Sequence, residues 1–152
     1  MSAAQDRAAS VRRIEDEVGV LIRRVRRVVA ERALAVHESL HPSTYLLLSH
    51  LAEHGPLRAS ALVGHFAMDK ASVSRQVQTL LDLGLVDRTP DPDDGRATLL
   101  SVSDDGLRRL TDVASHRRKL LDERLGDWGD EELADFAAVL ARYNATLDAR
   151  TD

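Results

Sequence analysis

The chain has 152 residues, which suits one domain or two small lobes that share a core, and its formal net charge is −4. It contains no cysteine, so disulfides, thiolate metal sites and thiol redox chemistry are excluded. No apolar run is long enough to span a bilayer, and the N-terminal residues lack the apolar core of a secretory signal. We therefore expect a cytoplasmic protein without membrane contact.

The first 40 residues are predicted to form one long helix. Their apolar side chains recur at spacings of three and four, the pattern of an amphipathic helix, at Ile14, Val18, Leu21, Val25 and Val28. Pro42 cannot continue a helix, and Ser43 is predicted as the N-cap of a second, shorter helix. That helix is predicted to stop at Gly55 and Pro56.

Two short amphipathic helices follow, within the stretches RASALVGHFAM and DKASVSRQVQTLLDLG. Asp69 is predicted to cap the second of these helices, and Gly84 is predicted to end it. Only a few residues remain for the turn between the two helices, which is the spacing of a helix-turn-helix.

The pattern then changes to period two. LVDRT and ATLLSV are short runs rich in Val, Leu and Thr, and PDPDDGR between them is dense in turn-forming residues, so this stretch predicts a β-hairpin. Ser103 is predicted to cap a long helix, and a final helix follows the stretch GDWGDEE. The expected order is α-α-α-α-β-β-α-α, a mainly α (α+β) fold.

The helix after the predicted turn has a distinctive outer face. On a helical wheel Val73, Val77 and Leu80 point inward together with Leu81. The other side carries small and hydrogen-bonding side chains: Ala71, Ser72, Arg75, Gln78 and Thr79, flanked by Ser74 and Gln76. A helix that enters the major groove of DNA needs this mixture, because small residues allow close approach and Arg or Gln binds base edges. An ordinary solvated face is the alternative, although such faces are more often rich in Glu and Lys.

Arg96 stands at the tip of the predicted hairpin, among Asp91, Asp93 and Asp94. A hairpin that directly follows a helix-turn-helix lies beside the same face of a duplex, where an arginine can enter the adjacent minor groove. Because these carboxylates would repel phosphate, at least one of them is predicted to fold back and pair with a guanidinium, that of Arg96 or of Arg88. A solvated turn without a binding role is the alternative.

The stretch ASVSRQVQTLLDLGLVDRTPDPDDGRATLLSVSDDG resembles the winged helix-turn-helix of the MarR (multiple-antibiotic-resistance regulator) family of transcriptional regulators. Within it, DPDDGR is similar to the family's wing signature, and the other predicted elements follow the family's order over nearly the whole chain. The resemblance implies DNA contacts by the outer helix face, at Ser72, Ser74, Arg75, Gln76 and Gln78. It also implies that Arg96 enters the minor groove and that Asp94, together with Arg88, orients the wing.

Two positions depart from the family's pattern. Ala67 stands where the turn before the recognition helix usually has glycine, and Arg58 stands where the preceding helix usually has a Ser or Thr cap. The family's organisation implies that residues 41–103 form the DNA-binding domain. Residues 1–40 and 104–152 would then form the helical dimerisation region.

The resemblance also implies an effector. Family members often respond to small, frequently aromatic or anionic molecules, which bind where the dimer helices meet the DNA-binding lobe. In this chain such a pocket would draw on His37, Tyr45 and Leu48. No residue pattern identifies the molecule itself.

Histidine pairs support a competing hypothesis in which zinc is the effector. His37 and His41 lie four residues apart, as do His50 and His54, and two imidazoles at this spacing on a helix can share a metal. Histidines without a metal are the more common outcome, so no cofactor is predicted. The sequence has no Gly-rich phosphate loop and no Ser/His/Asp grouping at motif-like spacing, so we do not expect an enzyme.

The sequence therefore predicts a homodimeric, sequence-specific DNA-binding transcriptional regulator. We expect a ligand-responsive repressor that binds a pseudo-palindromic operator in double-stranded DNA. The alternative from another class is a helical dimer that binds a protein or a small molecule and no DNA. The charge of residues 41–102, with seven Asp/Glu against five Lys/Arg, favours that alternative slightly.

Overall fold

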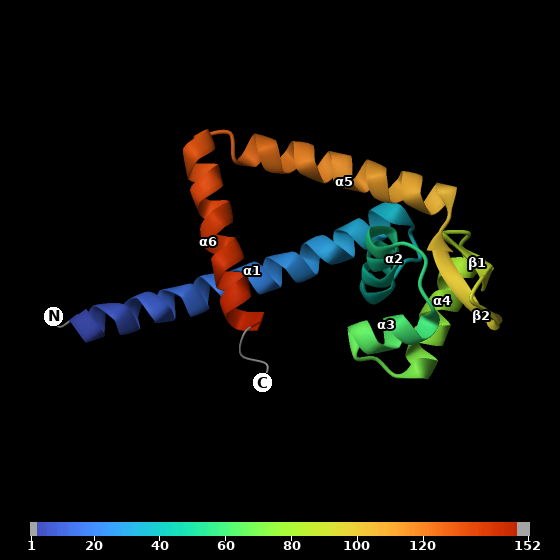
Figure 1. Ribbon diagram of the computed structural model, residues 1–152. Coiled ribbons are helices and arrows are strands. Elements are labelled where there is room, and N and C mark those ends of the chain that lie inside the picture. Colours follow the sequence, from blue (N-terminus) through green and yellow to red (C-terminus); the bar gives the residue numbers. More distant parts are fainter. Residues whose placement is uncertain (1–2, 149–152) are drawn as a thin grey trace. The chain divides into compact units, whose positions relative to one another are not determined.

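The structure, a computed structural model, describes residues 3–148, with side chains from Gln5 onward. These residues form six helices and one antiparallel two-stranded sheet (Figure 1). In chain order the elements are α1 (Ala3–Val36), α2 (Pro42–His54), α3 (Ala59–Phe66), α4 (Lys70–Asp82), β1 (Val86–Asp91), β2 (Asp94–Val102), α5 (Asp104–Arg124) and α6 (Asp130–Asp148). This order and the mainly α class confirm the prediction. No helix in the described range is long and apolar enough to cross a membrane.

The chain divides into two compact units. The first extends to Val113 and contains α1 to α4, the hairpin and the beginning of α5. The second begins at Ala114 and contains the rest of α5 and α6.

The connection between α1 and α2 differs from the prediction. α1 ends at Val36 and does not continue to residue 40, because the Leu40 N–H donates to the His37 carbonyl at 2.9 Å and closes a turn that buries Leu40. The N-cap of α2 is His41, and the predicted cap Ser43 is wrong. Proline is favoured in the first helical turn, so Pro42 begins the helix, and the His41 imidazole accepts from the backbone N–H of Ser43.

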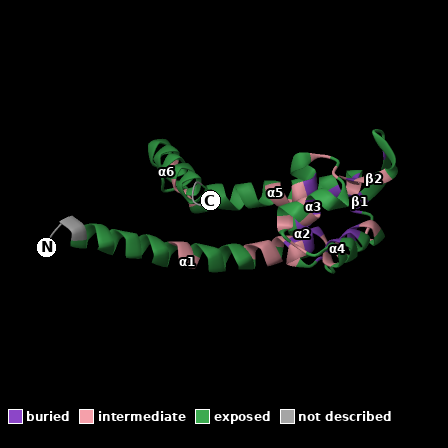
Figure 2. Cartoon of the chain, turned by 60° about the horizontal axis from the view of Figure 1, so that its bottom comes forward, coloured by how far each residue is buried: buried purple, intermediate pink, exposed green. Residues whose placement is uncertain are grey.

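The core of the first unit lies where α2, α3, α4 and the hairpin meet (Figure 2). Its fully buried side chains come from each of these elements and from the end of α1: Val36, Leu47, Leu48, Leu51, Leu62, Val73, Leu80, Leu85 and Leu100. Burying one such side chain stabilises a fold by about 1.5–3 kcal/mol. Most of α1 is exposed by comparison, which leaves much of its apolar stripe uncovered in the single chain.

The turn between α3 and α4 depends on a left-handed residue. Ala67 ends α3 with φ 48° and ψ 37°, and among the described residues it is the one non-glycine with positive φ. This is the position where the family that the sequence resembles usually has glycine. The turn therefore forms without glycine, at the expense of backbone strain.

The hairpin is longer and less regular than predicted. Its strands continue into the stretch of turn-forming residues, so only Pro92 and Asp93 separate β1 from β2. The pairing moves from Pro90–Thr98 directly to Asp91–Asp94, which leaves three residues of β2, 95–97, as a bulge. A short bridge between Leu57 and Leu100 joins the hairpin to the segment before α3.

The start of α5 is held against the end of α4. Ser103 caps α5 as predicted, since its hydroxyl accepts from the Gly106 N–H at 3.1 Å, and the same hydroxyl donates to the Gly84 carbonyl at 2.6 Å. Gly106 allows this close approach, because a β-carbon there would lie 2.3 Å from the Leu85 carbonyl oxygen.

The second unit has little core of its own. None of the residues of α6 is buried, and Phe136, Val139, Leu140 and Leu147 are exposed. Trp128, in the turn before α6, contacts Phe136 edge-to-face with a centroid distance of 5.6 Å.

Candidate nucleic-acid interface

α4 has well-defined ends. At its start the Asp69 carboxylate accepts from the Ser72 N–H at 2.8 Å, as predicted for its N-cap. At its end Gly84 has φ 69°, and the Leu85 N–H donates to the Leu80 carbonyl while the Gly84 N–H donates to that of Leu81. This pair of bonds is a Schellman motif, which confirms the predicted stop. Hydrogen bonds thus satisfy free backbone groups at both ends of the helix.

The two faces of α4 divide as the helical wheel predicts. Val73, Val77 and Leu80 are buried, and most of the other face is exposed: Ala71, Ser74, Arg75, Gln78 and Thr79. Ser72, also predicted on that face, is half-buried. The exposed face has no acidic side chain before Asp82, whose carboxylate accepts from the Gln78 amide at 2.7 Å. Small hydroxyls, an amide and one guanidinium therefore form a surface able to approach a polyanion.

Arg75 is tied to the helix start through Ser72. The Arg75 guanidinium donates to the Ser72 hydroxyl at 2.9 Å, and this hydroxyl donates to the Asp69 carboxylate at 2.6 Å. The Ser72 hydroxyl, its backbone N–H and the nearby Arg75 charge hold the pKa of Asp69 below its usual value. This chain of bonds gives the Arg75 side chain a preferred position on the outer face.

Gln76 differs from its neighbours. It is half-buried, and its amide nitrogen lies 3.9 Å from the Met68 sulfur. The side chain that the sequence assigned to DNA therefore faces the turn between α3 and α4 in this arrangement.

Arg96 lies in the bulge of β2. Its backbone N–H donates to the Asp94 carboxylate at 3.1 Å, and the residue is exposed. Within residues 3–148 no hydrogen bond or ion pair engages its guanidinium. A free cation at the tip of a hairpin is thus available to an external anion.

The carboxylates of the hairpin pair with a different arginine from those predicted. Asp91 is bound by Arg58, from the N-cap of α3, with Nε to Oδ2 at 2.6 Å, and neither Arg96 nor Arg88 takes this role. Arg58 also lies 3.8 Å from Asp94. The predicted pairing is wrong because Arg88, on β1, faces a cavity between the hairpin and α4.

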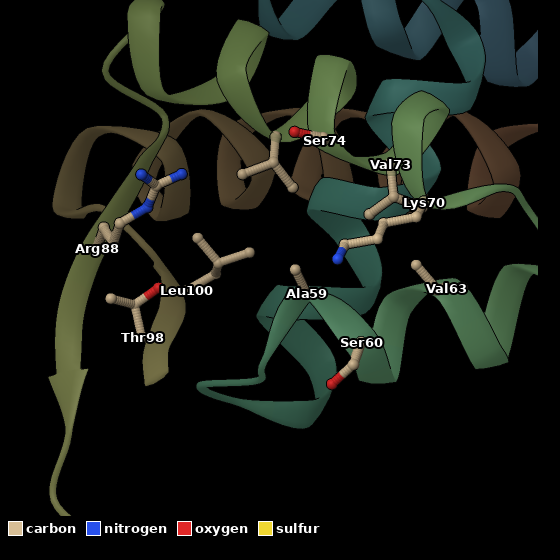
Figure 3. A pocket seen from close by; sticks show the side chains of 10 residues that line it. Ala59, Ser60, Val63, Lys70, Val73, Ser74, Arg88, Thr98 and Leu100 are labelled. Atoms are coloured by element: carbon tan, nitrogen blue, oxygen red, sulfur yellow. The ribbon is translucent and has the colours of Figure 1, made fainter. Parts of the chain in front are cut away.

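That cavity has a volume of about 320 Å³ and opens between α3, α4 and the hairpin (Figure 3). Arg88 and Lys70 extend toward it and supply two positive charges. The rest of its lining combines hydroxyls with an apolar floor: Ser60, Ser74 and Thr98, with Ala59, Val63, Val73, Val77 and Leu100. A pocket of this size and chemistry fits a small anion with an apolar body. The sequence did not predict this cavity, because its walls come from three separate segments.

The residues predicted for an effector pocket lie elsewhere. Tyr45 and Leu48 are part of the buried core, and His37 is half-buried just after α1. The His37 Nδ1 accepts from the Ser39 N–H at 3.1 Å.

The histidines do not converge as metal ligands. His50 stacks on His54 and on His65, with centroid distances of 4.0 and 3.8 Å, so ring faces and not nitrogen lone pairs meet. His41 Nδ1 is engaged by Ser43. In the described part of the chain, no group of three or more His, Asp or Glu side chains is placed to hold a metal ion. This geometry gives the zinc hypothesis no support.

Comparisons with known proteins agree with this architecture. The MarR family model matches residues 39–97. The uncharacterized HTH-type transcriptional regulator YxaD of Bacillus subtilis (strain 168) is 33% identical over 131 residues, which cover 86% of this chain and 90% of that protein. The HTH-type transcriptional repressor MdtR of the same organism is 24% identical over 105 residues, 69% of this chain and 68% of that one.

A solved structure supports the fold. The crystal structure of RV1404 from Mycobacterium tuberculosis superimposes with a TM-score of 0.77 at 23% identity, over 90% of this chain and 93% of that chain. With the capped recognition helix, the adjoining hairpin and the similarity to YxaD over most of both chains, the protein belongs to the MarR family of DNA-binding transcriptional regulators.

Proposed function

We propose that this protein is a homodimeric, ligand-responsive repressor that binds a pseudo-palindromic operator. The observation that carries the proposal is the outer face of α4, where small polar residues surround Arg75 on a helix capped at both ends. The similarity of the chain to the repressor MdtR supports repression, and not activation, of transcription. The relatives are regulators of transcription, which favours a regulatory role over a catalytic one.

In this proposal α4 enters the major groove and the hairpin follows the neighbouring minor groove. Ser72, Ser74, Arg75 and Gln78 would contact bases or phosphates, with Gln76 in a supporting position. Arg96 would enter the minor groove, where narrow A·T-rich stretches attract arginine. Two symmetry-related α4 helices would contact half-sites about 34–36 Å apart.

We propose that DNA binding and dimerisation belong to different parts of the chain, as the location of its exposed apolar residues suggests. Residues 41–103 would bind DNA, and residues 1–40 and 104–152 would form the dimer. The exposed apolar residues of the terminal helices support this division: Val11, Ile14, Leu21, Ile22 and Val25 of α1, Leu107, Leu120 and Leu121 of α5, and those of α6 named above. Extensive apolar exposure is typical of a surface that another chain covers.

The effector is proposed to be a small anion with an apolar, for example aromatic, body. The cavity that Lys70 and Arg88 line supports this class of molecule, and it adjoins α4 and the hairpin. The His37, Tyr45 and Leu48 region is the second candidate location. A molecule that binds preferentially to a dimer whose α4 helices do not fit DNA would shift the population away from the bound form.

Gel-shift titration with the DNA upstream of the protein's own gene tests DNA binding. We expect Arg75→Ala and Arg96→Ala each to weaken binding by about tenfold or more, with altered base preference for Arg75→Ala. The matched control is Arg27→Ala, which removes the same charge from an exposed α1 residue paired with Glu31. Wild-type affinity should fall steeply with added salt, because phosphate contacts release counterions.

Three outcomes would contradict parts of the proposal. Failure of the wild-type protein to retard any upstream fragment would favour a helical dimer without DNA binding. Wild-type affinity in both arginine variants would exclude these groove assignments. A change in operator affinity on adding a chelator would instead support zinc as the effector.

A benzoate titration tests the effector class. Benzoate, as a simple aromatic carboxylate, should release wild-type protein from the operator at lower concentration than it releases Arg88→Ala. Release at equal concentrations would mean that this cavity is not the effector site.

A further inference from the structure

Arg58 is an N-cap residue that does not cap its own helix. Its backbone has the extended conformation usual for an N-cap, with φ −71° and ψ 149°, but its side chain makes no capping hydrogen bond to α3. Ser, Thr, Asn and Asp are favoured here because they satisfy the free N–H groups of the first turn. The side chain instead extends to the hairpin, which suggests that its role lies there.

Both carboxylate oxygens of Asp91 are bound, one by Arg58 and the other by the backbone of Asp93. Asp91 Oδ2 accepts from Nε of Arg58 at 2.6 Å and lies 2.5 Å from Nη2, while Asp91 Oδ1 accepts from the Asp93 N–H at 2.9 Å. The Asp91 side chain is only 6% exposed, although the rest of the hairpin tip is open to solvent. Hydrogen bonds from Asp93 and Arg58 hold the pKa of Asp91 below its usual value. Asp91 therefore joins α3 to the turn of the hairpin.

This junction lies at the base of the bulge that carries Arg96. Asp91 pairs with Asp94 where the register shifts, and residues 95–97 follow directly. Arg58 is 3.8 Å from Asp94 through Nη1, and Asp94 accepts from the Arg96 N–H. A continuous set of polar contacts thus leads from the first helix of the helix-turn-helix to the backbone of Arg96.

We propose that Arg58 is a positioning residue for DNA recognition, which fixes the hairpin tip so that Arg96 is presented to the minor groove. An isolated two-stranded hairpin is only marginally ordered in water. A contact that holds the hairpin against α3 lowers the conformational entropy that the hairpin would otherwise lose on binding DNA. The inference rests on the proposed binding of Arg96 to DNA. Two nitrogens of the Arg58 guanidinium, Nε and Nη2, are directed to Asp91, so we expect Arg58 to act through Arg96 and not by its own contact with phosphate.

A double-mutant cycle on the full-length protein tests this inference, with operator affinity measured by fluorescence anisotropy. We expect Arg58→Ala to weaken binding by about tenfold in the wild-type background and by less than about twofold in the Arg96→Ala background. Asp91→Asn should reproduce this pattern, and Arg58→Lys should retain part of the affinity. Arg108→Ala is the control, since Arg108 is an exposed arginine paired with Asp105 and Asp112 on α5.

Hydroxyl-radical footprinting supplies the second readout. Arg58→Ala should lose protection of the minor groove under the hairpin and keep the protection that α4 gives. Equal losses from Arg58→Ala in both backgrounds would identify a direct contact and overturn the inference. Wild-type affinity in Arg58→Ala and Asp91→Asn would also overturn it while leaving the proposed function intact. Absence of binding by the wild-type protein would instead remove the proposed function and the inference together.

Discussion

Single residues set the strain and close approaches of this fold, and Ala67 is the clearest case. A left-handed conformation is unfavourable for alanine by roughly 1–2 kcal/mol, because its β-carbon approaches the neighbouring carbonyl. Glycine avoids this contact, although it also increases the conformational entropy of the unfolded chain. The strain therefore predicts a stabilising substitution in the turn of the helix-turn-helix.

We expect Ala67→Gly to stabilise the protein by about 0.5–1 kcal/mol and to raise Tm by about 1–4 °C. Ala61→Gly is the matched control, since Ala61 lies inside α3, where glycine should destabilise by about 0.5–1 kcal/mol. Calorimetry at fixed protein concentration measures both variants. A lower Tm for Ala67→Gly would show that the turn is not strained.

At Gly106, by contrast, replacing the glycine is expected to destabilise the protein. Gly106→Ala should destabilise by about 1–3 kcal/mol, because the new methyl group would meet the Leu85 carbonyl oxygen and Val102. Gly64→Ala is the control, because position 64 is helical and a β-carbon there would point into open space. The free energy of unfolding of this variant should increase by about 0.5–1 kcal/mol. Urea unfolding measures the change in the free energy of unfolding of each variant and so distinguishes a loss from a gain of stability. Equal effects would mean that α5 does not approach Leu85 this closely.

At the scale of elements, the packing of α2 against α3 brings three imidazoles together. Burial, together with the charges of His54 and His65, lowers the pKa of His50, and Glu53 opposes this shift. The folded protein therefore binds fewer protons than the unfolded chain once the pH falls below the ordinary histidine pKa of about 6.5. Stability from this group is complete above that pH and is lost as the pH falls toward the lowered pKa.

Acidification from about pH 7.5 to about pH 5.5 should accordingly lower Tm, and His50→Gln should make this decrease smaller. His116→Gln is the control, because His116 lies on α5 outside the cluster. Differential scanning fluorimetry at the two pH values provides the measurement. An identical pH dependence in His50→Gln and the wild-type protein would contradict the role of the cluster.

Local patterns were sufficient to predict most element types and several of their ends. Asp69, Gly84 and Ser103 act where the sequence placed them, because caps and stops depend on residues within one turn of the helix. The prediction of Ser43 as a cap is wrong, because histidine is a rare N-cap and the position of Pro42 sets the start of the helix. The role of Arg58 is not predictable from local patterns, because its partner Asp91 lies 33 residues away along the chain.

At the scale of the whole molecule, the single chain leaves α6 without a buried residue. Phe136, Val139, Leu140 and Leu147 recur at helical spacing along one side of α6, while Ala138 lies on the other side. An apolar stripe of this kind on a stable helix normally packs against another surface. A second copy of the chain is the proposed cover.

Leu140→Glu should therefore convert the proposed dimer to a monomer at micromolar concentration. Operator binding should weaken strongly as well, because each monomer would then bind one half-site without the gain from a linked second copy. Ala138→Glu introduces the same charge into the same helix and should leave the dimer intact. Sedimentation equilibrium determines the mass of each variant. A dimeric Leu140→Glu, or a monomeric wild-type protein, would exclude this surface as the interface.

Local patterns along the chain account for the order of elements, the division of α4 into an apolar and a polar face, and the exposed position of Arg96 near the hairpin tip. These features follow from periodicity, caps and turn residues, which act between neighbours along the chain. Three other features depend on tertiary packing: Arg58 binds Asp91, Gln76 turns toward Met68, and Arg88 faces a cavity. Such contacts join side chains from separate elements, and their geometry depends on how those elements pack.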